Sequence, residues 1–244
     1  MIELKQIRKD YGERTVIKNQ SLSIKDKEFF VLIGPSGSGK TTLLKLINRL
    51  IDPTEGDVLL NGKSVMDYPL RKLRLNTGYV LQQIALFPNL TVAENIELVP
   101  VMKKWPKQIR KEQTTQLLSK VGLDPKIYAH RYPHELSGGE QQRVGIVRAI
   151  IGKPEILLMD EPFSALDPIS RRQLQDLIKT LHHELGLTIV FVTHNMEEAA
   201  YLGDRLCIMN HGEIIQTGTP DEIKSRPEND FVDRFFSRGC DGFE

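Results

Sequence analysis

The chain has 244 residues, of which 33 are basic and 32 acidic, with 40% hydrophobic residues and a net charge of +1. This composition is typical of one large globular domain, and the charge balance argues against a general nucleic-acid binder, which needs a basic face toward phosphates. The chain has no apolar run of the roughly 18 residues that span a bilayer and no signal-peptide core at its N-terminus, so we expect any membrane role to come through a partner.

Short strands and tight turns are predicted for the first third of the chain. The stretch 56–60 runs into Asn61-Gly62, the dipeptide that most strongly favours a two-residue hairpin. An apolar run at 29–33 has the length of a buried strand, and a glycine-rich loop follows it. Apolar residues at helical spacing come next and predict a helix after the loop: Leu43, Leu46, Ile47 and Leu50.

The glycine-rich loop, 34–42, reads GPSGSGKTT and matches the phosphate-binding pattern G-x-x-x-x-G-K-[ST] between a strand and a helix. Its glycines allow successive N–H groups to point at phosphates, and the helix start adds further donors. We predict that Lys40 reaches the β- and γ-phosphates of ATP and that the Thr41 hydroxyl ligates Mg²⁺. A plain glycine-rich turn, the alternative, does not require the flanking strand and helix. The predicted nucleotide-binding residues are Gly34, Ser36, Gly37, Ser38, Gly39, Lys40, Thr41 and Thr42.

Between about Leu90 and Pro154 the strand signals disappear and helical patterns replace them. Strand signals return at 156–159 and 188–192, separated by a long helical pattern, and this alternation predicts a mostly parallel central sheet. We therefore expect a single α/β domain over 1–244, with a body at about 1–89 and 155–244 and a helical subdomain at about 90–154. A last hairpin is predicted at 210–212, and an amphipathic helix near the C-terminus.

Two adjacent acids, Asp160 and Glu161, follow the apolar strand 156–159. The carboxyl ends of parallel strands are where ligands bind in open α/β folds, and side chains alternate along a strand, so the two acids point in different directions. We predict that Asp160 holds Mg²⁺ and that Glu161 polarises the attacking water. The alternative is a pair of solvated acids that merely ends a strand.

Residues 136–143 read LSGGEQQR and open a helix with a hydroxyl and sterically open N–H groups from Ser137, Gly138 and Gly139. A second phosphate-binding helix start suits a nucleotide held by a partner subunit. A serine-capped helix start, the alternative, does not account for the whole octapeptide. LSGGEQQR is the signature motif of the ABC ATPases, the superfamily that the chain resembles over nearly its whole length.

This resemblance implies further site residues. Tyr11 resembles the aromatic residue that stacks on adenine, and Gln82 resembles the glutamine that senses Mg²⁺ and water and couples to a permease. His194 resembles the switch histidine that contacts the γ-phosphate, and 164–167 resembles the loop that crosses the dimer interface. Asn195 departs from the Asp of many relatives, and we expect the departure to weaken a local interaction and to leave the nucleotide contact intact.

The resemblance also implies an architecture and partners. We expect a P-loop NTPase fold with an N-terminal antiparallel β-subdomain and an inserted helical subdomain. We expect a homodimer with ATP at its interface, on the cytoplasmic face of the membrane, bound to integral-membrane permease subunits that receive solute from an extracellular or periplasmic binding protein. No nucleic-acid partner is expected. The cluster 85–88 beside Gln82 is predicted to contact the permease, unless Leu86 and Phe87 pack into the core instead.

Segments 47–50, 82–88 and 167–171 look like those of importers for osmoprotectants and other quaternary amines, such as glycine betaine, choline or carnitine. Some relatives carry C-terminal regulatory modules, and none is expected here because the sequence ends at Glu244. Three alternatives remain open: an importer ATPase for another small solute such as an amino acid, a non-transport ABC ATPase, and another P-loop class such as a kinase or GTPase. A purely structural nucleotide-binding scaffold is disfavoured by Glu161 and His194.

Overall fold

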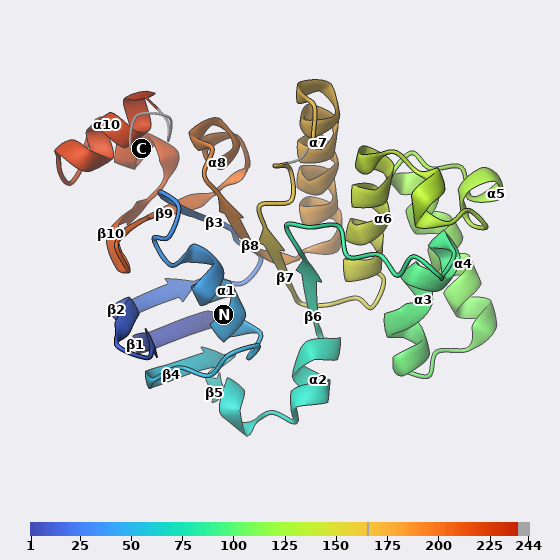
Figure 1. Cartoon of the computed structure of the whole chain (residues 1–244), viewed down its shortest axis with the longest axis horizontal. Coiled ribbons are helices and arrows are strands. Elements are labelled where there is room, and N and C mark those ends of the chain that lie inside the picture. Colours follow the sequence, from blue (N-terminus) through green and yellow to red (C-terminus); the bar gives the residue numbers. More distant parts are fainter. Residues whose placement is uncertain (165, 239–244) are drawn as a thin grey trace. The chain divides into compact units, whose positions relative to one another are not determined.

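The computed structural model describes residues 1–164 and 166–238 and divides into two units. Unit 1 comprises Met1–Leu73 and Gly186–Glu244, and unit 2 comprises Arg74–Leu185. Ala165, in the predicted interface loop, lies outside the described residues. Each unit has its own strands (Figure 1) and its own buried side chains.

An antiparallel sheet opens unit 1. Its strand order is β2 (Arg14–Ile24), β1 (Ile2–Tyr11), β4 (Glu55–Leu60) and β5 (Lys63–Ser64). The predicted hairpin joins β4 to β5, and Asn61 and Gly62 have positive φ angles of 51° and 77°. Two positive φ angles define the type I′ turn, which Asn-Gly favours.

Parallel strands form the second layer of unit 1. β3 (Phe29–Ile33) lies between β8 (Thr188–Thr193) and β9 (Arg205–Asn210) and is parallel to both. Every residue of β3 and β8 is buried, as expected for strands covered on both faces. β10 (Glu213–Gly218) adds an antiparallel edge through the predicted 210–212 hairpin.

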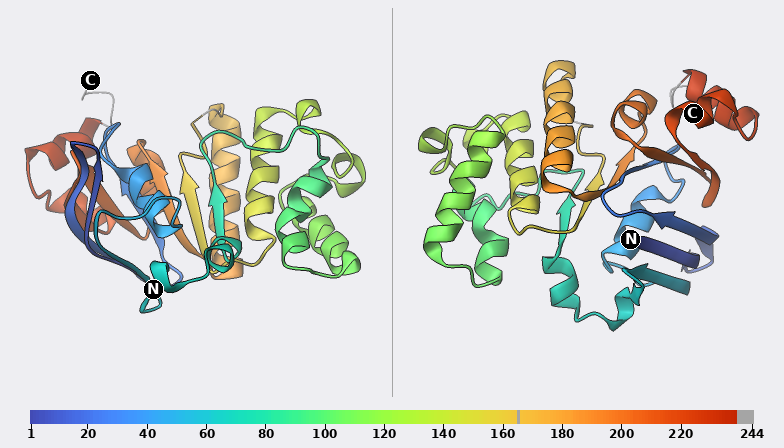
Figure 2. Two further views of the ribbon diagram at one scale, coloured as in Figure 1. Left: turned by 60° about the horizontal axis from the view of Figure 1, so that its bottom comes forward. Right: turned by 180° about the vertical axis from the view of Figure 1, so that it is seen from behind.

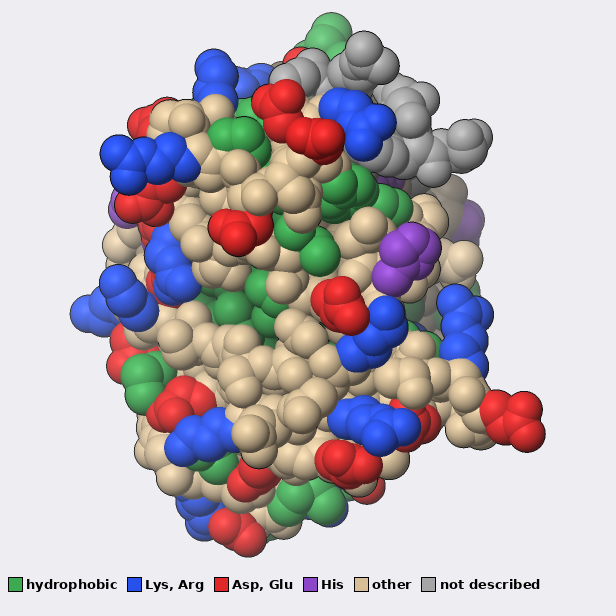
Figure 3. Space-filling view, turned by 90° about the vertical axis from the view of Figure 1, so that its left-hand side faces the viewer, with side chains coloured by type: hydrophobic (Ala, Val, Ile, Leu, Met, Phe, Trp, Pro, Cys, Tyr) green, Lys and Arg blue, Asp and Glu red, His purple; other side chains and the backbone are tan. Residues whose placement is uncertain are grey.

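The helices of unit 1 pack around these strands. α1 (Lys40–Ile47) contacts β8, and α8 (Met196–Leu202) contacts both β3 and β8. α9 (Pro220–Ser225) and the predicted C-terminal helix α10 (Asp230–Arg238) follow β10. Figure 3 shows the side on which α10 and β10 lie, where acidic and basic side chains are interspersed.

Unit 2 contains a parallel strand pair, β6 (Thr77–Val80) and β7 (Ile156–Asp160), and the long helix α7 (Pro168–Leu185). β7 is buried along its whole length, so its apolar residues carry the chain to Asp160 without exposing the strand. The short helix α2 (Leu70–Leu75) crosses the boundary between the units. Within the described part of the chain, we find no helix with the length and apolarity needed to cross a bilayer.

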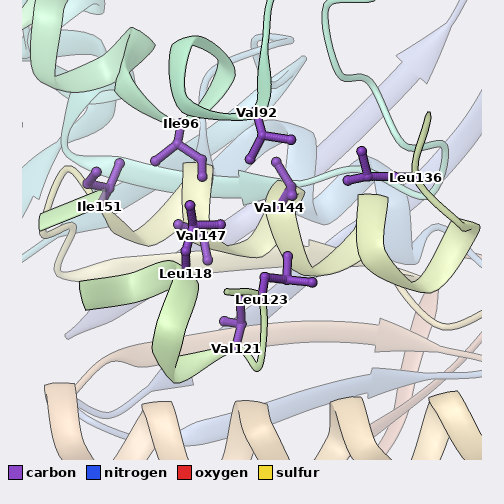
Figure 4. Close-up of a cluster of buried hydrophobic side chains, with 9 residues drawn as sticks. All are labelled: Val92, Ile96, Leu118, Val121, Leu123, Leu136, Val144, Val147 and Ile151. Carbon is purple, nitrogen blue, oxygen red and sulfur yellow. The ribbon is translucent and has the colours of Figure 1, made fainter. Parts of the chain in front are cut away.

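The stretch between β6 and β7 holds a short 3-10 helix (Pro133–Glu135) and four α-helices: α3 (Val92–Met102), α4 (Lys107–Lys120), α5 (Pro125–Tyr128) and α6 (Gly138–Ile150). α3 lies beside α6 in the views of Figure 2. A hydrophobic core, drawn in Figure 4, includes side chains of α3, α4 and α6, and each fully buried aliphatic side chain contributes roughly 1.5–3 kcal/mol relative to exposure. Its members are Val92, Ile96, Leu118, Val121, Leu123, Leu136, Val144, Val147 and Ile151.

Candidate active site

The glycine-rich loop of unit 1 joins β3 to α1. Gly37 and Gly39 have φ angles of 76° and 104°, a region that glycine enters without the steric penalty of other residues. Gly39 is the N-cap of α1 and supplies no side chain to cap it. The N–H groups of the first helical turn are therefore not capped in the usual way, by a hydroxyl or carboxylate at the N-cap. A helix start of this kind favours an anion through its N–H groups and its dipole.

Lys40 begins α1, and its side chain is buried. Its Nζ donates hydrogen bonds to the carbonyl oxygens of Gly34 at 2.7 Å and Pro35 at 2.9 Å. A buried ammonium needs such acceptors, and charged phosphate oxygens would accept more strongly than neutral carbonyls. The ammonium is thus held at the loop rather than in bulk solvent. An uncapped helix start with an ammonium beside it fits a polyphosphate.

The predicted magnesium ligands also fit that ion chemically. Mg²⁺ in nucleotide sites takes one or two carboxylates and completes its shell with phosphate oxygens and water. Thr41 lies in the first turn of α1 in unit 1, whereas Gln82 and Asp160 belong to unit 2. Among the residues that the structure describes, His, Cys, Asp and Glu do not gather in threes to form a separate metal site.

Two more predicted residues belong to unit 1. Tyr11 ends β1 with 48% of its surface exposed, and Lys9 Nζ lies 5.1 Å from its ring centroid. His194 is exposed and directly follows β8. Asn195 then caps α8, because its Oδ1 accepts a hydrogen bond from the Glu198 N–H. Asn is among the preferred N-cap residues, and the expected weakening of a local interaction at this position stays a prediction.

The two acids of unit 2, Asp160 and Glu161, differ in backbone conformation. Asp160 is the last residue of β7 and is buried, and burial together with the Asp160 charge raises the pKa of the Tyr79 phenol. Glu161 has a φ of 43°, a left-handed conformation that costs a non-glycine residue roughly 1–2 kcal/mol. The N–H and hydroxyl of Ser164 both donate to the Glu161 carbonyl and hold this conformation. Strain of this type is concentrated at functional sites.

The structure brings Gln82 to Glu161. Gln82 follows β6 in unit 2, and its amide Nε2 lies 3.4 Å from the Glu161 carboxylate Oε2. A hydrogen bond of this length is weak, so the two side chains are neighbours that a third group can separate. Two of the predicted catalytic residues, Gln82 and Glu161, thus lie in contact.

The start of α6 is capped by its own side chains. Ser137 Oγ accepts from the Glu140 N–H at 3.3 Å, and the Glu140 carboxylate accepts from the Ser137 N–H at 2.7 Å. Ser137 Oγ also donates to that carboxylate at 2.9 Å. This is a capping box, which the S-x-x-E spacing of 137–140 could have predicted. The serine-capped helix start, the alternative considered from the sequence, is therefore present in the structure.

Glu140 has a second partner, the Tyr128 hydroxyl at 2.5 Å. Hydrogen bonds from Tyr128 and from Ser137 hold the pKa of the Glu140 carboxyl below its ordinary value, against the opposing effect of burial. A Cβ built at Gly138 meets no atom within 4 Å, and one at Gly139 meets only Ser170 at 3.7 Å. The glycines beside the capping box are thus sterically open.

The predicted site residues fall into two groups. Unit 1 holds Tyr11, the 34–42 loop and His194, and unit 2 holds Gln82, the acid pair and 137–139. That both groups act on one nucleotide stays a prediction. The sequence did not reveal the roles of Glu140 and Tyr128 at α6.

Comparisons with known proteins extend this picture. A family model described as ABC transporter matches residues 17–164. The glycine betaine/carnitine/choline transport ATP-binding protein OpuCA of Bacillus subtilis is 50% identical over 239 residues, which cover 98% of this chain and 63% of that protein. The glycine betaine uptake system ATP-binding protein YehX of Escherichia coli is 44% identical, with 98% of this chain and 77% of that protein covered. The chain spans less than two thirds of the length of OpuCA.

Solved structures give the same fold. A dimeric ATP-binding cassette, MJ0796, in a post-hydrolysis state bound to ADP and Pi, has a TM-score of 0.81 and 37% sequence identity. The match covers 90% of this chain and 98% of that one. The predicted fold class, a P-loop NTPase with an antiparallel N-terminal sheet, parallel strands and a helical stretch, is thereby confirmed.

Proposed function

The chain belongs to the ABC transporter family, as 136–143 predicted, and on that premise we propose that it is the ATP-binding and ATP-hydrolysing subunit of an importer. The observation that best supports ATP binding is the start of α1, with a glycine N-cap and a buried ammonium at the loop. The resemblance assigns the adenine to Tyr11 and a γ-phosphate contact to His194.

Hydrolysis is assigned to unit 2. The Glu161 carboxylate would accept a proton from water as the water oxygen attacks the γ-phosphorus, and the bond to the ADP oxygen breaks. Gln82 lies 3.4 Å from Glu161, so its amide would orient the same water. Thr41, Gln82 and Asp160 would hold Mg²⁺, which neutralises charge on the phosphates when bound.

A homodimer follows from the two helix starts. The α1 start is suited to phosphates, and the glycines Gly138 and Gly139 leave open space at the α6 start, so one nucleotide per subunit would use one start from each subunit. A two-fold pair satisfies both sites at once, as is usual in homodimers. The dimeric MJ0796 cassette supports this arrangement by similarity.

The transported solute is proposed to be a quaternary amine. Glycine betaine, carnitine and choline appear in the names of relatives that are 50% identical. The partners would be an integral-membrane permease, on whose cytoplasmic side the subunit works, and an extracellular or periplasmic binding protein. An importer ATPase for another small solute, such as an amino acid, is the alternative.

The test is Glu161→Gln in the transporter reconstituted with its permease and binding protein. We expect hydrolysis to fall roughly 10²- to 10⁴-fold, because an amide cannot take the proton, while ATP binding persists. Uptake of radiolabelled glycine betaine, carnitine and choline should fall with it. Hydrolysis near the wild-type rate would contradict the assignment of Glu161, and wild-type uptake of an amino acid alone would favour the alternative solute.

A further inference from the structure

The segment between β6 and α3, residues 81–91, has neither helix nor strand. It carries Gln82 at one end and Phe87, with 51% of its surface exposed, near the other. Backbone N–H and C=O groups outside helices and sheets form their hydrogen bonds largely with side chains or water. Two buried or half-buried side chains from neighbouring helices of unit 2 supply such bonds.

Asn95 of α3 holds the second half of this segment. Its side chain is fully buried, its Oδ1 accepts from the Phe87 N–H at 2.8 Å, and its Nδ2 donates to the Phe87 carbonyl at 3.1 Å. Nδ2 also lies 3.0 Å from the carbonyl oxygens of Leu90 and Thr91. The backbone of Phe87 is therefore fixed on both sides while its ring stays exposed. Leu86, next to it, is partly buried against the helical core.

Arg148 of α6 holds the first half. Its Nη1 donates to the Ala85 carbonyl at 2.6 Å, across 63 residues of sequence. Burial lowers the pKa of the guanidinium, so Arg148 is partly removed from water. A charged donor to a backbone carbonyl gives a stronger hydrogen bond than a neutral one. This bond is the contact that joins the first half of the segment to the helix that begins at 137–139.

A small cavity lies beside this contact. Its volume is about 10 Å³, at the lower limit for one water molecule. Gln142, Gly145 and Arg148 line it from α6, and the residues that line it from the other side are Val80 at the end of β6 and Leu81, Gln83, Ile84 and Ala85 of the segment. Gln142 Nε2 is buried and has no hydrogen-bond partner among the described residues. Beside this cavity, α6 therefore presents the Gln142 amide and the guanidinium of Arg148, which donates to the Ala85 carbonyl.

We infer that Arg148 is a positioning residue for Gln82 and for the surface around Phe87. It ties the segment to α6, the rigid helix whose first residues are proposed to bind the partner subunit's nucleotide. A displacement of α6 is then passed to the segment through the Ala85 carbonyl, while Asn95 keeps the Phe87 end fixed to α3. This inference rests on the proposed function for the nucleotide and the permease that would bind at the two ends. The clamp itself, which consists of the hydrogen bonds from Arg148 to Ala85 and between Asn95 and Phe87, lies within unit 2.

Amide hydrogen exchange in the full chain, without permease, tests the clamp directly. In Arg148→Met, which keeps the length of the side chain and removes its donors, we expect the amides of 82–86 to exchange roughly tenfold faster or more. The amides of Phe87, which donates to Asn95 Oδ1, and of Leu90, which donates to the Phe87 carbonyl, should keep their protection. Arg148→Lys keeps one donor and should restore part of the protection at 82–86.

Gly145→Ala is the matched control on the same helix face. A Cβ at Gly145 meets no atom within 4 Å, so the substitution fills space at the cavity without removing a hydrogen bond. Its exchange pattern should equal that of the wild type. If Gly145→Ala loosened 82–86 as much as Arg148→Met, or if Arg148→Met loosened the whole chain equally, the positioning role would be overturned.

Kinetics of the assembled transporter complete the test. Because the 34–42 loop is untouched, Arg148→Met should leave the KM for ATP unchanged and lower kcat, with partial recovery in Arg148→Lys. An equal rise in KM with no change in kcat would overturn the inference. Failure of the proposed permease contact is distinguishable, because it would show in the Phe87 variant described below and would leave the exchange result intact.

Discussion

The helices α1 and α6 begin in opposite ways. At α1, in unit 1, the N-cap is a glycine with no capping side chain, and the nearest charge is the Lys40 ammonium. At α6, in unit 2, Ser137 and Glu140 satisfy each other's N–H groups, and the nearest charge is a carboxylate. The first start is prepared for an anion, whereas the second is complete on its own. If α6 binds a phosphate as proposed, that phosphate must compete with the Glu140 carboxylate, so we expect this half of the proposed site to bind more weakly than α1 does.

Mixed dimers test whether the two helix starts serve one nucleotide. Lys40→Ala removes the ammonium at α1, and Ser137→Arg blocks the start of α6, so each variant alone should be inactive. In a heterodimer one site receives both defects and the other receives none. With random pairing of equal amounts, roughly a quarter of wild-type hydrolysis should return if the sites are independent.

The mixing experiment needs proof that heterodimers form, for example by differential tags and co-purification. Ser137→Ala, which loses the cap but adds no bulk, serves as the control for folding. Absence of recovery at every ratio, with heterodimers present, would contradict independent composite sites.

Much of the fold could be predicted because its signals are local. Asn61-Gly62 and His211-Gly212 adopt positive φ angles, β3 is an uninterrupted apolar run, and β7 and β8 each contain an apolar run of four residues. The octapeptide 136–143 identified the family. These features need no knowledge of distant contacts.

The rest of the site depends on contacts that no local pattern encodes. Glu161 has no intrinsic preference for a positive φ, so only the surrounding structure and Ser164 could impose it. Arg148 reaches Ala85 from 63 residues away. Leu86 and Phe87 looked like one apolar cluster, yet one packs on the core and the other is exposed, because an irregular segment has no fixed periodicity.

Charged substitutions at Phe87 and Met66 compare an exposed apolar side chain of unit 2 with one of unit 1. Both are exposed apolar side chains, at 51% and 44%, but Phe87 belongs to unit 2 and Met66 to unit 1. If Phe87 contacts the permease, Phe87→Glu should lower uptake roughly tenfold or more, as expected when a charge replaces a central apolar contact. Met66→Glu should leave uptake near the wild-type rate.

Stability separates this interface effect from damage to the fold. Because both side chains are exposed, each substitution should change the free energy of unfolding by less than about 0.5 kcal/mol, and ATP affinity should stay constant. A lower melting temperature for Phe87→Glu alone would show that its ring packs in the core, and equal loss of uptake in both variants would contradict a local contact.

The smallest expected effect is the pH dependence of the α6 cap. Tyr128→Phe removes the hydroxyl that donates to Glu140 and keeps the ring, which packs against the helical core and against Arg131. The loss of this hydrogen bond should lower the free energy of unfolding by about 1 kcal/mol at neutral pH, because solvent exposure weakens a bond to a charged group. For a chain of this size, that corresponds to a fall in Tm of about 2–4 °C.

The pKa of Glu140 is lowered in the folded state from an ordinary value of 4.5. The contribution of its carboxylate to stability is therefore complete above that pH and is lost as the pH falls through the lowered pKa. The Tm difference between wild type and Tyr128→Phe should therefore be constant near neutral pH and shrink as the pH falls below 4.5. In a Glu140→Gln background, where the cap remains and the carboxylate is gone, the difference should no longer depend on pH in this range. A difference that did not shrink at any pH below 4.5 at which the wild type stays folded would show that the Tyr128 hydroxyl does not act through the Glu140 carboxylate.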